Sequence, residues 1–466
     1  MENLAKYKEA LIVLPFLLLI LLLASVQPVM ISEISKDLLN RKSPASSEVP
    51  VKISNTNDSM TTISESSQQD VKISDEGPRL NMSSIAKEKI YDTGNRKFRI
   101  HYTDVSEDYV KFVGYAFSKA SEFQLSLGFN NIILTPNAHD FKDGKVAIYV
   151  KDSIDDNACK AVTSHAHLQY MGMSDDLEKW QIYLAAAHCY FKAVEASYNT
   201  LEYEASEGNA WINDGIARFI VLYTAMNDPE YKQYDEEYNK YGYLNNVMVE
   251  GKKTYGYAPY QVPTITEDAP LQYGITKLGS LSVSYWYYLH KLYGMQIIED
   301  VVAKSGFYKG DSVELVSSVL ANYNTTFAQS VTGWYESIGF WNKGKIGDFS
   351  VYEGLTLVDD EIFKDYRSSE LPINIENRLM EYGASFVSLD FDSGSPIVQL
   401  RFLNLGEIVY LYVYIHNTNT DKYYYQTFNV ERGHQDFLVW TENAEINFII
   451  IGGEKSFTEG FRIAAL

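Results

Sequence analysis

One predicted helix carries the residues whose types and spacing could do chemistry. His188, Lys192 and Glu195 stand at positions i, i+4 and i+7, so all three lie on one face of that helix. A neutral imidazole and a carboxylate can bind a metal ion or carry a proton, whereas an ammonium has three donors and no acceptor. Cys189 lies about 100° around the helix from His188, so these two residues do not make a ready Cys–His dyad.

The elements that must position these groups are predicted from apolar periodicity. Residues 175–198 form the helix that carries them, and residues 209–225 form a second helix with an apolar face. Up to residue 342 we further predict strands at 97–102, 145–150 and 161–170 and helices at 107–127, 273–292, 296–304, 312–321 and 327–338. Short alternating runs then follow at 385–390, 398–402, 408–415, 423–430 and 446–451, which is typical of a β-sandwich or jelly roll. We therefore expect an α+β domain at 87–346 and an all-β domain at 347–466.

The two motif helices resemble those of the gluzincin metallopeptidases. That family carries HExxH on one helix and, about twenty residues later, a zinc-binding Glu in a W-x-x-E-G-x-A context. This sequence has HCYFK at 188–192 and WINDGIA at 211–217, and 22 residues separate Lys192 from Asp214. YWYYLHKLYG at 285–294 and EYGASFV at 381–387 resemble a later helix and the start of the sandwich in secreted members. The resemblance implies a thermolysin-like domain, a small sheet plus a helical subdomain, followed by a β-sandwich.

The resemblance also assigns a former role to each residue of the site. His188 stands at the first zinc-ligand position, Cys189 at the general-base position, Lys192 at the second ligand position and Asp214 at the third. A thiol with an ordinary pKa of about 8.5 is a poor base, and a lysine must lose a proton of pKa about 10.4 to bind metal. We therefore expect no catalytic zinc and no other cofactor.

The family layout brings Asp214 against the helix face that carries Lys192. We expect the Lys192 ammonium to stand where zinc stands in active relatives and to form a buried ion pair with Asp214, with Glu195 as a further partner. The alternative is plain surface charge on both helices.

Histidines and cysteines elsewhere allow other sites. His165 and His167 alternate on the predicted strand at 161–170, and with His188 and Asp214 they could form an atypical metal site. Two exposed strand histidines are the simpler interpretation. We expect Cys189 to be a packed and inert thiol, and the sequence leaves a disulfide with Cys159 open. His290 is expected to be structural. Tyr285, Tyr287 and Tyr288 could line a cleft, but core and rim packing is the simpler interpretation.

The N-terminal part predicts a location outside the cytoplasm. Residues 10–31 are uncharged and apolar, after a short cytoplasmic segment at 1–9, and fit either a membrane anchor or a signal peptide. A buried core helix is the third interpretation. Residues 32–86 contain no aromatic residue, although aromatics make up 14% of the chain, and are rich in Ser and Thr, which predicts a disordered stalk. Asn57, Asn81 and Asn324 each begin a glycosylation acceptor pattern.

Charge and cysteine content exclude several classes of function. The formal net charge is −21, so the chain repels polyanions and we expect no nucleic-acid partner. Two cysteines exclude a disulfide scaffold and a cysteine-rich zinc module. The favoured hypothesis is a metallopeptidase-like protein at the cell surface that binds protein, peptide or glycan without peptidase activity. The alternatives are an active extracellular metallohydrolase and a structural envelope component.

Overall fold

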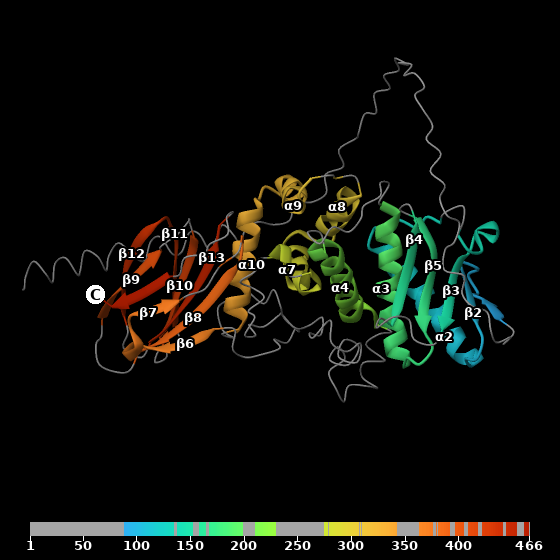
Figure 1. Ribbon diagram of the computed structural model, residues 1–466, viewed down its shortest axis with the longest axis horizontal. Helices are drawn as coiled ribbons and strands as arrows, with labels where there is room; N and C mark the ends of the chain where they lie inside the picture. The colour runs from blue at the N-terminus through green and yellow to red at the C-terminus, as the bar shows by residue number, and fades with distance from the viewer. Residues whose placement is uncertain are drawn as a thin grey trace, which may run out of the picture. The chain divides into compact units, whose positions relative to one another are not determined.

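The computed structural model describes residues 88–134, 138–151, 158–164, 167–198, 210–229, 275–277, 279–306, 308, 310–342, 363–375, 379, 381–391, 397–404, 409–417, 422–440, 444–453 and 461–465 (Figure 1). All of them belong to one unit, Met82–Leu466. The predicted membrane segment at 10–31, the stalk at 32–86 and the domain boundary after 346 lie outside the described residues. Within these ranges, no helix is long and apolar enough to cross a membrane.

A five-stranded mixed sheet comes first. Its strands are β1 (Lys89–Asp92), β2 (Phe98–Tyr102), β3 (Val146–Lys151), β4 (Cys159–Ser164) and β5 (His167–Ser174), in the order β1-β2-β3-β5-β4. The three central strands run parallel, and the edge strands β1 and β4 pair antiparallel with their neighbours. Phe98, Ile100 and Met171 are fully buried in one core with side chains of α2 (Glu107–Ser126) and α3 (Lys179–Tyr198). Both helices therefore pack on this sheet.

The predicted strand at 161–170 is wrong, because the chain reverses within it. β4 ends at Ser164, β5 begins at His167, and these two residues pair in an antiparallel hairpin. The sequence around the reversal, SHAH, has none of the Gly, Pro or Asn residues that normally mark a turn. The other strands and helices predicted before residue 200 are confirmed with small shifts of their ends.

A group of helices follows the sheet. They are α4 (Ala210–Asn227), α7 (Val283–Tyr293), α8 (Gln296–Ser305), α9 (Ser312–Leu320) and α10 (Phe327–Asn342). The helix predicted at 273–292 begins later than expected, after 3-10 turns at Ile275–Lys277 and Gly279–Ser282. Large aromatic side chains fill the space between the helices, and Tyr285 and Tyr287 are among the fully buried ones, as predicted.

Strands after residue 363 form two more sheets. The β10 sheet has the order β11-β10-β13-β8-β6 and comprises β6 (Lys364–Arg367), β8 (Ala384–Asp390), β10 (Val409–Asn417), β11 (Lys422–Val430) and β13 (Ala444–Gly452). The β9 sheet has the order β12-β9-β14-β7 and comprises β7 (Ile373–Ile375), β9 (Ile397–Asn404), β12 (Gly433–Trp440) and β14 (Phe461–Ala465). Both sheets contribute residues to one buried cluster: Val387 and Leu411 come from the β10 sheet and Phe402 from the β9 sheet. The two sheets therefore pack face to face. The prediction of an α+β fold with several sheets is confirmed.

Helix α10 joins the helices to the outer face of the β10 sheet. Towards α7, the Tyr285 hydroxyl bonds to the Ser330 hydroxyl at 2.8 Å, and Trp334 Nε1 donates to Ser284 Oγ at 3.2 Å. Towards the sheet, a Cβ at Gly339 would collide with the side chain of Ile449. The glycine thus allows the helix to approach β13 closely.

A partly buried carboxyl lies on the sheet side of α10. The Tyr412 hydroxyl of β10 bonds to Thr332, and the charge of Glu336, one turn further along the helix, acts on the same tyrosine. Burial raises the pKa of Glu336 to about 7 from an ordinary value of 4.5. A raised pKa means that the folded state prefers the protonated acid.

Stability should therefore depend on pH through Glu336. Its contribution is fully present below about pH 4.5, declines as the pH rises and is gone above about pH 7, a loss of up to about 3 kcal/mol. Glu336→Gln should flatten this part of the curve of unfolding free energy against pH, measured by urea denaturation. Glu431→Gln, at an exposed site, is the control for removing one carboxyl group from the chain. An equal slope in the parent and the Glu336 variant would contradict the assignment.

Candidate functional site

Helix α3 presents the predicted site residues from a buried position. It contacts α2, α4 and the strands β4 and β5, and most of its side chains are buried. Lys192 and Glu195 follow His188 by one and two turns, so they share a face as the sequence predicted. Residues at this spacing are surface neighbours on a helix, and here that shared face turns towards α4.

The predicted ion pair is present. Lys192 Nζ donates to Glu195 Oε2 at 3.0 Å and to Asp214 Oδ1 of α4 at 3.0 Å. The Glu195 side chain is 8% exposed, that of Lys192 26% and that of Asp214 43%, so the cluster runs from the interior to the surface. The alternative of plain surface charge on two separate helices is wrong.

Electrostatics keep the ammonium charged. Burial works to lower the pKa of Lys192, but the charges of Glu195 and Asp214 outweigh it and hold the pKa above its usual value. Burial raises the pKa of the Glu195 carboxyl, and the attraction of Lys192 opposes that rise without cancelling it. Lys192 is therefore a fixed internal cation at neutral pH.

His188 is half-buried beside this cation. Burial, followed by the positive charges of Lys192 and of Arg218 on α4, lowers its pKa to about 4. The imidazole is therefore neutral at neutral pH, as a metal ligand would need to be. The ammonium one turn away, however, repels any metal ion that the imidazole could bind.

Asp214 is positioned by tight packing at the start of α4. The Trp211 carbonyl accepts hydrogen bonds from Ser282 Oγ at 2.5 Å and from Trp286 Nε1 at 2.9 Å, and the two indoles stack with centroids 5.3 Å apart. A Cβ on Gly215 would collide with both Ser282 and Trp286. Only glycine fits next to Asp214, which explains the small residue at this point of the WINDG motif.

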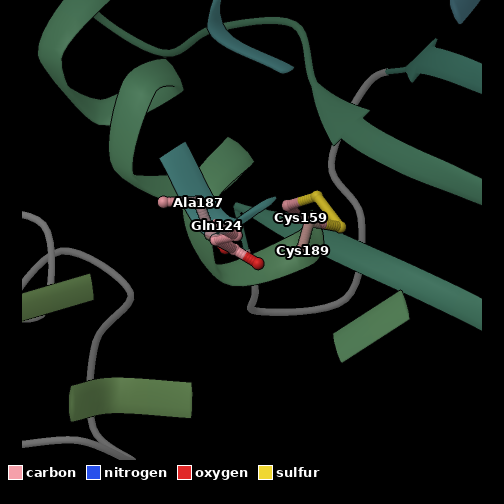
Figure 2. Close-up of a disulfide and its surroundings, with 4 residues drawn as sticks. All are labelled: Gln124, Cys159, Ala187 and Cys189. Atoms are coloured by element: carbon pink, nitrogen blue, oxygen red, sulfur yellow. A yellow bond between two sulfur atoms is a disulfide. The ribbon is translucent and has the colours of Figure 1, made fainter. Parts of the chain in front are cut away.

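Cys189 is not a free thiol, and this corrects the prediction of an inert thiol. It forms a disulfide with Cys159 of β4, across a Cα–Cα distance of 5.8 Å (Figure 2). Next to it, Gln124 Nε2 of α2 donates to the Ala187 carbonyl at 2.8 Å. Helix α3 is thus tied to the edge strand and to α2 on both sides of His188. A disulfide sulfur has no proton to exchange, so Cys189 cannot act as a base.

The other candidate histidines are described only in part. His165 lies outside the described residues, and His167 begins β5 with its side chain undescribed. His290 packs among the rings of Phe219, Tyr223 and Tyr287, which agrees with the predicted structural role, and burial lowers its pKa to about 4. Among the described side chains, no group of three or more His, Cys, Asp or Glu is close enough to hold a metal ion.

The donor set at 188, 192 and 214 therefore does not fit zinc. One position offers a neutral imidazole and one a half-exposed carboxylate, but the third is an ammonium that lies between the carboxylates. Zinc in catalytic sites needs three acceptor ligands arranged around the ion. The cluster links the two helices through its ion pairs.

Comparisons with known proteins yield little. No family model matches the sequence. No curated protein matches it. One structural match is a family GH115 4-O-methyl-α-glucuronidase with specificity for decorated arabinogalactans, at 10% identity and a TM-score of 0.14. The match covers 73% of this chain and 54% of that enzyme, so this chain spans about half of its length. A TM-score this low carries no argument about fold or function.

Removing the internal cation should destabilise the protein. Lys192→Met leaves the Glu195 carboxylate buried without its partner, and we expect a loss of about 3 kcal/mol in unfolding free energy. Asp214→Asn is the matched control, because its side chain is 43% exposed and should cost at most about 1 kcal/mol. Urea denaturation of both variants measures the difference. Equal, small effects would contradict a buried ion pair.

A methyl group next to Asp214 should also be poorly tolerated. Gly215→Ala forces Ser282 and Trp286 away from α4, and we expect a loss of about 2 kcal/mol in unfolding free energy. Gly94→Ala is the control, since a Cβ there meets nothing within 4 Å and should change stability by no more than about 0.5 kcal/mol. Similar melting of the two variants would show that α4 does not need this close approach.

Proposed function

We propose that this protein is a metallopeptidase-like protein that has lost zinc and peptidase activity and acts by binding outside the cytoplasm. The observation that carries the proposal is the Lys192 ammonium, 3.0 Å from carboxylates on both motif helices. A protein-borne cation stands between the groups that the HExxH layout would offer to a metal ion.

The order and packing of the elements support a thermolysin-like domain as the origin of the site. A mixed sheet with an antiparallel edge strand precedes α3, and α4 brings Asp214 against the face of α3 that carries Lys192. The aromatic helix α7 then packs on the start of α4, and two face-to-face sheets follow. This order agrees with the resemblance stated for the sequence.

The disulfide supports a location outside the cytoplasm. Disulfides persist in oxidising compartments and are rare where glutathione and thioredoxin keep thiols reduced. Cys159 and Cys189 are 6% and 1% exposed, so the bond is part of the core. The apolar segment at 10–31 predicts the same location through an anchor or a signal peptide. In that setting the proposed partners are a protein, a peptide or a glycan at the cell surface.

Restoring acceptor ligands should restore metal binding. Lys192→His combined with Asp214→Glu leaves His188 and the disulfide in place and supplies the three ligands of the family pattern. We expect the full chain with both changes to take up one zinc per molecule, measured by elemental analysis after incubation with zinc and gel filtration. The parent protein should take up none under the same conditions, because its site holds an ammonium.

The control replaces Lys192 by Met together with Asp214→Glu, which removes the charge without adding a ligand, and it should bind no zinc. If the variant with Lys192→His and Asp214→Glu folds but binds no zinc, that result would contradict the thermolysin-like assignment. Zinc in the parent protein, lost on His188→Ala, would favour an active metallohydrolase. A parent protein that binds neither peptides nor glycans on arrays would favour a structural envelope component.

A further inference from the structure

The turn between α9 and α10 exposes an asparagine within an acceptor pattern. Asn324 ends the 3-10 turn Ala321–Tyr323 in the left-handed region, with φ 55° and ψ 36°, and its N–H donates to the Ala321 carbonyl at 3.2 Å. Its side chain is exposed, in contrast to Asn404 and Asn447, which are 1% and 0% exposed. The chain therefore presents this amide to solvent once it has folded.

The hydroxyl two residues later is also at the surface. Thr326 is exposed and caps α10: its Oγ1 accepts from the Gln329 N–H at 3.2 Å, and its own N–H donates to Gln329 Oε1 at 3.0 Å. The hydroxyl accepts in this cap. The residue that completes the N-x-T pattern thus also begins the helix that joins α7 to the β10 sheet.

We propose that Asn324 carries an N-linked glycan, a modification that rests on the extracytoplasmic location proposed above. The donor is an oligosaccharide on a lipid pyrophosphate. Asn324 Nδ2 forms a bond to the anomeric carbon of the first sugar and gives up one proton. The bond from that carbon to the pyrophosphate oxygen breaks, and the lipid pyrophosphate leaves with the electron pair.

Folding and modification are compatible at this position. Acceptor patterns in secreted proteins lie in surface loops, and an attached glycan excludes any fold that buries the asparagine. Burial of the preceding residue does not conflict, because the Tyr323 hydroxyl turns inward and donates to Asp300 Oδ2 at 2.8 Å. The Tyr323 ring also packs on Tyr293.

The test uses the full chain, produced in a eukaryotic secretory host with Asn57→Gln and Asn81→Gln, so that a single acceptor pattern remains. We expect intact mass spectrometry to show one glycan, which peptide-N-glycosidase removes and leaves Asp at position 324. Asn324→Gly keeps the left-handed backbone and should lose the glycan completely. Thr326→Ala should lose it as well, whereas Thr326→Ser keeps both the hydroxyl and the cap and should retain it.

Three outcomes would overturn the proposal, and the first two distinguish failure of the site from failure of the location. If the chain with all three acceptor patterns carries glycans on Asn57 or Asn81 and none on Asn324, the site is wrong while the location stands. If none of the three asparagines is modified, the extracytoplasmic location fails together with the site. A glycan that persists in Asn324→Gly would also contradict the assignment.

Discussion

The Lys192 ammonium, held between one carboxylate of its own helix and one of the next, is the interaction on which the candidate site depends. A carboxylate as deeply buried as Glu195 is costly unless a charge or hydrogen-bond donor compensates it. The ammonium supplies that compensation within α3 and also binds Asp214 near the N-terminal end of α4. Lys192 thus offsets the cost of burying Glu195 and holds Asp214 in position at the surface.

Independent contacts hold the two helices in place, so the ion cluster sits in a frame that it does not have to create. Gln124 and the disulfide anchor α3 to α2 and to β4. Trp211 anchors α4 to the turn before α7 and to α7 itself. These anchors are hydrogen bonds, one covalent bond and stacked rings, none of which responds to charge at the site. The site residues between these anchors could therefore be substituted while the backbones of α3 and α4 kept their positions.

Local periodicity predicted most of the helices and strands, and it placed Lys192 and Glu195 on one face of a helix. The spacing of Lys192 and Glu195 within one helix allowed their contact. The contact to Asp214 depends on how α4 packs, and its prediction came only from the family resemblance. The sequence offered Cys159 as the partner of Cys189 but left the bond open, because the bond depends on how β4 packs against α3. Short or charged strands such as β6, KDYR, were missed since three or four residues give no readable alternation. Pairing with neighbours, and not local sequence, makes them strands.

The disulfide has a consequence for the history of such a site. On the proposed descent, the position that once held the catalytic base now supplies one half of a cross-link in the core. A single mutation back to glutamate would strand a buried Cys159 thiol, place a charge against it and remove a bond worth about 3 kcal/mol. This first step back would thus be less stable than the present chain. On the proposed descent, selection for folding alone would be enough to keep Cys189 at this position.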